Sequence, residues 1–349
     1  MDHELVDLLR KLSEAYGPPG YEDEVRQIMI KEMEKVADEV YVDTLGNVIA
    51  VHKGNSPKIM LTAHMDEVAL LITHIDKNGF LRFHILGGID PRVLYSQEVV
   101  IKTEKESIHG YIGAKPPHLL KPEEKKKTLD IEQLFIDIGA SSKEEVEKLG
   151  IYVGSTATFT PRFKKLKNYR VMGKAFDDRA GCTTLIEVMK RIKDLPCTVY
   201  AVATVQEEVG LRGARTATWQ IEPDMGLALE GTTASDTPGT PEHLTSTKLG
   251  YGPAITIADR SIITHPKILR KLIETAKENK IPFQFKRTVS GGTDAGVIHL
   301  TKKGVPAGVV SIPCRYIHSP LSILDLNDLK NTVELVVAFI QKLKGSKTV

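Results

Sequence analysis

From residue 171 to the C-terminus, apolar strand-like runs alternate with amphipathic helical patterns. Strands that alternate with helices favour a mostly parallel sheet with helices on both faces. This pattern is the strongest constraint in the sequence, because it predicts an α/β fold class with a mostly parallel mixed sheet. The predicted elements of this region are strands at 198–205, 225–229 and 307–312, and helices after residue 178, at 266–279 and near 329–340.

A different pattern fills residues 68–163, where short alternating runs are separated by turn signals. Asn78-Gly79 stands between two such runs and is a strong hairpin signal. We therefore predict one discontinuous α/β domain, residues 1–67 and 164–349, with an inserted β-rich domain at 68–163. The charged run at 121–128 is interpreted as a solvated loop or helix face.

Composition excludes several classes of protein. The 349 residues include 47 Lys and Arg against 45 Asp and Glu, a net charge of +2, which argues against a dedicated nucleic-acid partner. No apolar run reaches the roughly 20 residues of a membrane span, and the N-terminus lacks a secretory signal pattern. The 3 cysteines are too few and too scattered for a disulfide framework or a thiolate zinc site. We therefore expect a cytoplasmic protein without a membrane partner, in which any metal ligands are His, Asp and Glu.

Histidines and acidic residues follow the predicted strands. They are His64 and Asp66 after 58–63, Glu207-Glu208 after 198–205, Glu230 after 225–229, His318 after 307–312, and Asp177-Asp178 at a helix start. Open α/β sheets bind ligands outside the carboxyl ends of their strands, so we expect these side chains at one edge. Carboxylates grouped there raise one another's pKa unless a cation neutralises them. Counted as one ligand from each of these five segments, two histidines and three carboxylates suit a two-metal hydrolytic site.

The Glu207-Glu208 doublet offers two roles at one position of the site. Successive side chains at a strand end point in different directions. One glutamate can therefore bind metal while its neighbour faces the attacking water as a general base. For a single histidine after a strand, a structural role is the more common one, and Asp178 is equally well explained as a helix N-cap.

Five motifs together resemble the tetrahedral (TET) aminopeptidases, dinuclear metallopeptidases also described as glutamyl aminopeptidases or endoglucanases. The resemblance covers nearly the whole chain, including the insert. It implies a zinc-peptidase-like fold, with residues 1–67 and 164–349 as the catalytic domain. The motifs are Ala63-His64-Met65-Asp66-Glu67, Ala175-Phe176-Asp177-Asp178-Arg179, Val205-Gln206-Glu207-Glu208-Val209-Gly210, Ser290-Gly291-Gly292-Thr293-Asp294-Ala295 and Arg315-Tyr316-Ile317-His318-Ser319.

The resemblance implies two divalent ions per subunit, zinc or cobalt, and a role for each site residue. Glu207 is expected to be the general base that activates a metal-bridging water, and Asp66 is expected to orient His64. Asp177 is expected to bridge the two ions. The implied metal ligands are His64, Asp177, Glu208, Glu230 and His318.

The resemblance also implies weaker assignments for the substrate and for assembly. Arg212 and Asp294 are candidate substrate-pocket residues, and a structural ion pair or turn role explains each of them equally well. The insert is expected to be a dimerisation domain, with dimers forming a tetrahedral homododecamer. His118 would then lie near a neighbouring subunit's site, although by itself it is best interpreted as a loop histidine.

The expected activity is removal of N-terminal residues from short peptides. Glu230 departs from the family pattern, in which the matching residue is commonly Asp, and a Glu is frequent in carboxypeptidases and deacylases of the wider superfamily. A metal-dependent deacylase or carboxypeptidase-type hydrolase is therefore the alternative. The Glu207-Glu208 pair gives little support to a glycosidase, because histidines accompany it. A non-catalytic binding module of the same fold would hold no stoichiometric metal.

Overall fold

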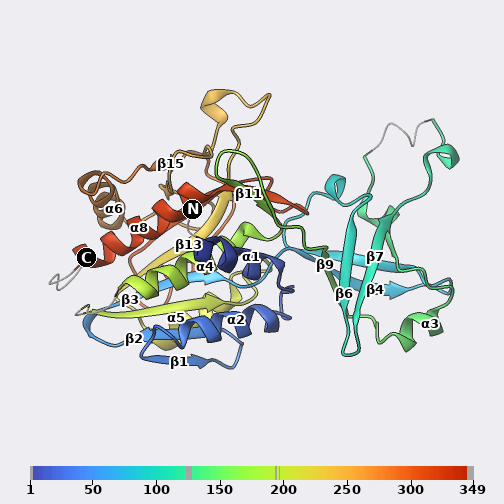
Figure 1. The fold of residues 1–349 in the computed structure, drawn as a ribbon, viewed down its shortest axis with the longest axis horizontal. Helices are drawn as coiled ribbons and strands as arrows, with labels where there is room; N and C mark the ends of the chain where they lie inside the picture. The colour runs from blue at the N-terminus through green and yellow to red at the C-terminus, as the bar shows by residue number, and fades with distance from the viewer. Residues whose placement is uncertain (1–2, 123–127, 193–194, 196, 344–349) are drawn as a thin grey trace. The chain divides into compact units, whose positions relative to one another are not determined.

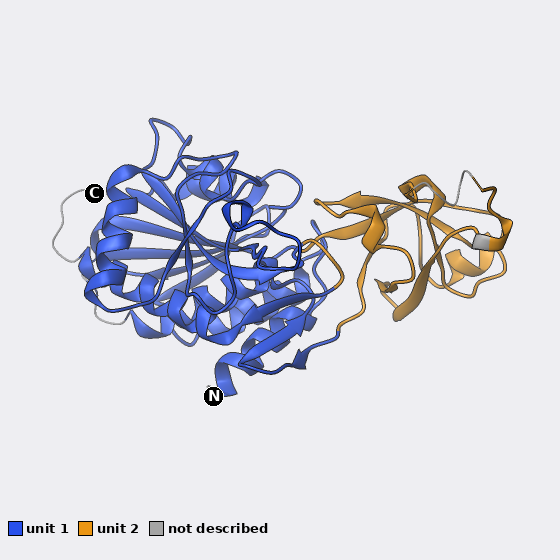
Figure 2. Cartoon of the chain, turned by 90° about the horizontal axis from the view of Figure 1, so that it is seen from above, with its two compact units in different colours: residues 1–66, 162–317, 321–349 blue, residues 67–161, 318–320 orange. Residues whose placement is uncertain are grey.

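The structure is a computed structural model that describes residues 3–122, 128–192, 195 and 197–343. The chain divides into two compact units (Figure 2). Unit 1 comprises residues 1–66, 162–317 and 321–349, and unit 2 comprises residues 67–161 and 318–320. Most of the charged run at 121–128, and with it the predicted loop or helix face, lies outside the described residues.

An 11-stranded mixed sheet forms the centre of unit 1, as far as the described residues show (Figure 1). Its middle strands are parallel and its outer strands are antiparallel, which confirms the predicted α/β class. The main path runs β1 (Glu39–Val42), β2 (Val48–His52), β12 (Cys197–Thr204), β3 (Asn55–His64), β13 (Met225–Thr233), β16 (Ala307–Arg315), β17 (Ser322–Asp325), β11 (Arg170–Gly173) and β10 (Lys164–Lys165); β14 (Ala254–Thr256) pairs with β16 and with β15 (Gln284–Lys286).

Helices cover both faces of this sheet, because successive side chains of a buried strand point to opposite sides. Leu61 of β3 packs in one core with Leu185 of α4, whereas its neighbour Met60 packs in another core with Ala217 of α5. The helices of unit 1 are α1 (His3–Glu14), α2 (Asp23–Met33), α4 (Phe176–Arg191), α5 (Arg212–Ile221), α6 (Pro266–Glu278), α7 (Ala295–Ile298) and α8 (Leu326–Lys342). None of the described helices is both long enough and apolar enough to cross a membrane.

Unit 2 is a small closed antiparallel barrel with its own apolar core. The hairpin predicted at Asn78-Gly79 is confirmed, since β4 and β5 pair in antiparallel fashion on either side of it. Gly79 has φ +88°, a backbone conformation that glycine adopts readily. The barrel order is β4 (Ala69–Ile75), β5 (Leu81–Leu86), β8 (Phe135–Asp137), β7 (Ser107–Gly113), β6 (Glu98–Lys102) and β9 (Thr156–Phe159), and α3 (Lys143–Lys148) precedes β9.

Candidate metal centre

The carboxyl ends of three adjacent parallel strands bring the predicted site residues of unit 1 together. His64 ends β3 and is paired in register with Thr204, the last residue of β12, so the loop after β12 starts beside it. Ala228 of β13 is in register with Thr62 of β3, and Glu230 follows two residues later on the same face of the strand. The alternation of strands and helices therefore places the acids beside His64.

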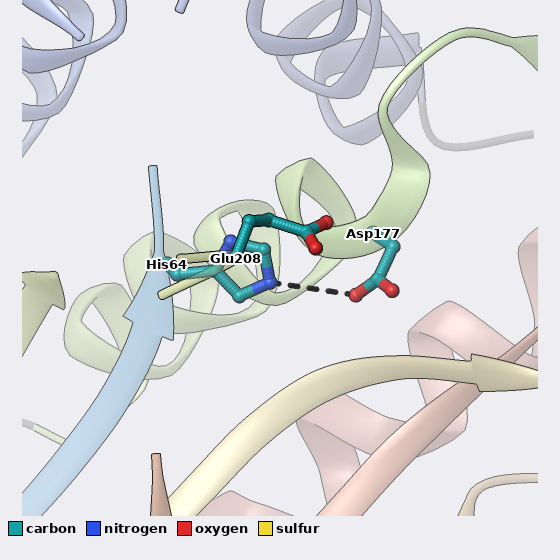
Figure 3. Close-up of side chains that lie close together, drawn as sticks. All are labelled: His64, Asp177 and Glu208. Atoms are coloured by element: carbon teal, nitrogen blue, oxygen red, sulfur yellow. Dashed lines mark ion pairs between the residues drawn. The ribbon is translucent and has the colours of Figure 1, made fainter. Parts of the chain in front are cut away.

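One group of potential metal donors is formed by His64, Asp177 and Glu208. One donor atom from each lies within 4.8 Å of the other two, and Figure 3 shows the three side chains turned toward one another. Nε2 of His64 lies 3.5 Å from Oδ1 of Asp177. An imidazole nitrogen and two carboxylates form a donor set that suits zinc or cobalt.

A second group consists of the carboxylates of Glu207, Glu230 and Asp294, whose oxygens also lie within 4.8 Å of one another. Glu230 and Asp294 are buried, and the Glu207 side chain is only 10% exposed. Oε2 of Glu207 lies 3.8 Å from Nε2 of His64, so the two groups are neighbours.

Burial and mutual repulsion disturb the protonation of this cluster. Burial raises the pKa of Glu207 and of Glu230 well above the usual value, and neighbouring carboxylates raise it further. Burial also raises the pKa of Asp294 to about 6. Burial lowers the pKa of His64, but Glu207, Asp177 and Asp66 outweigh it, so this pKa lies well above its usual value. A divalent cation stabilises the charged form of carboxylates that burial and mutual repulsion disfavour, and these donors therefore fit a metal.

Asp66 lies against both His64 and the Glu207-Glu208 doublet. Its carboxylate oxygens accept the backbone N–H groups of Glu207 (2.9 Å, Oδ1) and Glu208 (3.0 Å, Oδ2). Nδ1 of His64 lies 3.5 Å from Oδ1 of Asp66 but only 3.1 Å from the backbone oxygen of the same residue. The carboxylate therefore orders the segment after β12, and its predicted role in orienting His64 stays a prediction.

Asp178 connects β3, α4 and β13 by hydrogen bonds next to the site. Its Oδ2 accepts the backbone N–H of His64 at 3.1 Å, and its Oδ1 accepts those of Gly181 at 2.9 Å and Gly231 at 3.0 Å. The bond to Gly181, three residues later, is typical of a helix N-cap, because Asp177 and Asp178 themselves have non-helical φ and ψ. Asp178 thus caps the regular part of α4, which begins after it, and also binds β3 and β13.

The remaining predicted residues fall in different places. Arg212 is the first residue of α5, and its Nη1 donates to Oε1 of Gln206 at 3.1 Å. Asp294 is deep in the carboxylate group, where Oδ2 accepts the Thr204 hydroxyl at 2.7 Å. Two of the predicted site histidines belong to unit 2: His118 is exposed in the short 3-10 helix Pro117–Leu119, and Nδ1 of His318 lies 3.0 Å from the oxygen of Gly88.

Sequence reasoning missed the buried polar residues that support the site. Glu22 and Asn47 contact the backbone after β12, although each is distant in sequence. Asn47 lies between two strand-like runs and Glu22 follows a Gly-Pro-Pro-Gly break, so both positions are typical of turns. The sequence carries no signal that points from these turns to residues 205–208.

A mostly parallel sheet with grouped imidazole and carboxylate donors at its carboxyl edge defines a metallohydrolase-type site. The chain belongs to the M42 glutamyl aminopeptidase family, whose model matches residues 46–335. The lysyl aminopeptidase of Pyrococcus furiosus is 38% identical over 341 residues, which cover 97% of this chain and 97% of the relative.

Solved structures agree with this assignment. The TET aminopeptidase from a marine sediment archaeon, Thaumarchaeota archaeon SCGC AB-539-E09, matches with a TM-score of 0.95 and 44% identity over 99% of this chain and 98% of its own. The TET1 peptidase of Pyrococcus horikoshii matches with a TM-score of 0.87 and 37% identity over 96% of this chain and 99% of its own. The resemblance predicted from the motifs is therefore confirmed, and the chain is a peptide-bond hydrolase of the aminopeptidase class.

Proposed function

We propose that this chain is a two-metal aminopeptidase that removes N-terminal residues from short peptides, with Glu207 as the general base. The observation that carries the proposal is the pair of adjoining donor groups, His64 with Asp177 and Glu208, and Glu207 with Glu230 and Asp294. Family membership supports the peptide substrate. The number of ions and the role of Glu207 are inferred from the donor arrangement.

We assign His64, Asp177, Glu208 and Glu230 as ligands of zinc or cobalt ions, and His318 keeps the ligand role that its motif predicts. Bound divalent ions supply Lewis acidity, which polarises the scissile carbonyl and lowers the pKa of the attacking water. The remaining chemistry belongs to side chains of the protein.

The proposal assigns the proton transfer to Glu207. Its Oε2 lies 3.8 Å from Nε2 of His64, so its carboxylate is next to the first donor group. A glutamate whose pKa is raised by burial is a stronger base than an exposed one, and after taking a proton from water it can donate that proton to the leaving amine. The free amino group of the peptide would sit against the ligand carboxylates, which explains a preference for an unblocked N-terminus.

Metal content and N-terminal blocking together test this proposal. We expect the purified protein to hold stoichiometric divalent metal by elemental analysis, and a chelator to abolish hydrolysis of aminoacyl-anilides. N-acetylated peptides should not be cleaved. Hydrolysis of N-acyl amino acids in preference to anilides would instead support the deacylase or carboxypeptidase-type alternative. A protein without metal and without activity would support a non-catalytic binding module.

We also propose that the chain self-assembles as a tetrahedral homododecamer built from dimers through unit 2, with His118 near a neighbouring subunit's site. Support comes from the Pyrococcus horikoshii TET1 peptidase, which can assemble into a tetrahedron or a large octahedral shell. Light scattering after gel filtration should give the mass of twelve chains, and deletion of residues 68–163 should abolish the dimer. A cytoplasmic location fits the three cysteines, which are free and buried.

A further inference from the structure

Four consecutive backbone N–H groups after β12 are each bound by a side-chain oxygen from a distant part of unit 1. Asn47 Oδ1 accepts from Val205 at 3.0 Å, Glu22 Oε1 accepts from Gln206 at 3.2 Å, and Asp66 accepts from the next two residues at 2.9 and 3.0 Å. We call Glu22, Asn47 and Asp66 the N–H clamp. All three residues are at most 1% exposed.

The carbonyl groups of the same segment are bound from the opposite direction. Gly213 donates to the oxygen of Val205 at 2.9 Å, Arg212 to that of Gln206 at 3.2 Å, and Leu211 to that of Glu207 at 2.9 Å. The start of α5 thus binds one side of the segment while the N–H clamp binds the other. Residues 205–207 therefore have both backbone groups satisfied in a fixed arrangement.

The segment needs this support because its backbone turns sharply just before the catalytic doublet. Gln206 has φ +54°, in the left-handed region that non-glycine residues rarely adopt. Such a conformation persists only where surrounding contacts hold it. The backbone N–H of Gln206 is accepted by Glu22, which precedes α2 and is remote in sequence from every proposed metal ligand.

One arginine, Arg26, contacts both Glu22 and the residue before Asn47. Nη2 of Arg26 lies 3.7 Å from Oε2 of Glu22, and Nε of Arg26 donates to the oxygen of Gly46 at 2.8 Å. Asn47 follows Gly46, and its Nδ2 donates to Oδ2 of Asp43 at 2.6 Å. Arg26 therefore links the two acceptors, by an ion pair to Glu22 and by a hydrogen bond to the turn that holds Asn47.

We propose that Glu22 is a positioning residue, which acts through the backbone of Gln206 to fix Glu207 as base and Glu208 as ligand. The inference rests on the proposed function for those two glutamates. A group held by its neighbours within a fraction of an ångström reacts faster, and loss of such support typically lowers metal affinity or activity by about 10- to 100-fold.

Three variants of Glu22 and one matched control test the proposal. Glu22→Ala removes the acceptor, Glu22→Asp keeps the charge but shortens the reach, and Glu22→Gln keeps an acceptor oxygen at full length. Glu24→Ala is the control, because Glu24 lies two residues away and Oε2 of Glu24 also accepts a backbone N–H, that of Tyr16 at 3.1 Å. The control loses an equivalent bond that does not reach residues 205–208.

The measurements are kcat and KM on an aminoacyl-anilide, thermal unfolding, and the visible absorption spectrum of the cobalt-loaded protein. We expect Glu22→Ala to lower kcat by about 10- to 100-fold with KM changed less than about threefold, and to alter the cobalt bands. Glu22→Gln should restore most of kcat, and Glu24→Ala should match the wild type in kcat and spectrum. If Glu22→Ala does not fold, Glu22→Asp should still lower kcat at least about fivefold.

Three results would overturn the positioning role. They are wild-type kcat and cobalt spectrum in Glu22→Ala or in Glu22→Asp, an equal loss in Glu24→Ala, and a loss of kcat that merely follows the folded fraction. Failure of the proposed function can be told apart from failure of the positioning role, because the wild-type protein itself would then show no chelator-sensitive hydrolysis.

Discussion

The carboxylate of Glu230 accepts the backbone N–H of Asp294, with 2.8 Å between Oε1 and N. The bond ties β13 to the residue before α7 and holds two buried carboxyl groups next to each other. At the position of Glu230, the family that the motifs resemble commonly has Asp, whose side chain is one methylene shorter than that of Glu. The length of the glutamate side chain therefore decides whether this bond exists.

Glu230→Asp should lower the stability of the metal-free protein. The shorter side chain withdraws from the N–H of Asp294 and leaves a buried donor without its acceptor, a loss of about 1–3 kcal/mol in the free energy of unfolding. Thermal or urea unfolding of chelator-treated protein measures the change. Glu230→Gln is the control, because it keeps an oxygen at full length and removes a charge from the cluster. Equal stability of the Asp variant and the wild type would contradict this account.

Substitution of Glu207 and substitution of Glu208 should have different effects, the first on turnover and the second on metal content. Glu207→Gln keeps the shape of the side chain but cannot accept a proton, so turnover should fall by about 10²- to 10⁴-fold while metal content stays unchanged. Glu208→Gln should instead lower metal content, because a neutral amide is a weaker ligand than a carboxylate. Steady-state kinetics together with elemental analysis separates the two. Wild-type turnover in the Glu207 variant would disprove its role as base.

Much of the fold follows from short-range patterns in the sequence. The buried run that ends in His64 predicts β3, and the run before Gln206 predicts β12, because parallel strands covered by helices are apolar along their length. Once these strands lie side by side, their carboxyl ends bring His64 and the doublet together. The clustering of the acids could therefore be predicted without any tertiary information.

The elements and contacts that the sequence did not reveal are short or long-range. The helix α7 has only 4 residues, too few for an apolar pattern to repeat at helical spacing, and strand β17 also has 4. Asn47 and Glu22 are polar residues of turns, and their partners lie 158 and 184 positions away in the chain. Such hydrogen bonds depend on how the strands are ordered in the sheet, which local propensity does not encode.

Gly181→Ala should severely destabilise the protein. A Cβ at Gly181 would come within 2.3 Å of both carboxylate oxygens of Asp178 and of the backbone oxygen of Leu229. The displaced carboxylate would lose its bond to the N–H of His64, so the free energy of unfolding should fall by about 3 kcal/mol. Denaturant titration measures the loss. Gly292→Ala is a matched control, since its nearest neighbour, Cβ of Ser261, lies 3.5 Å away, and comparable stability of the two variants would refute the steric argument.

Asp328 should make the stability of the protein depend on pH. This residue of α8 is fully buried, and its carboxylate accepts the backbone N–H groups of Gly250 and Gly252, each at 2.7 Å. Burial raises the pKa of Asp328 to about 7, although these two bonds oppose the shift. The folded protein therefore keeps a proton that the unfolded chain releases above about pH 4. Folding is favoured while that proton is held.

As the pH rises toward 7, this contribution is lost, at up to about 1.4 kcal/mol per pH unit. The wild type should therefore lose about 2.6 kcal/mol more than Asp328→Asn between pH 5 and pH 8. The Asn variant does not titrate and serves as the reference, because every other ionisable group is shared. Urea unfolding at the two pH values measures the difference. If both proteins lose the same free energy of unfolding over this range, Asp328 does not hold a proton in the folded state, and its two backbone bonds outweigh its burial.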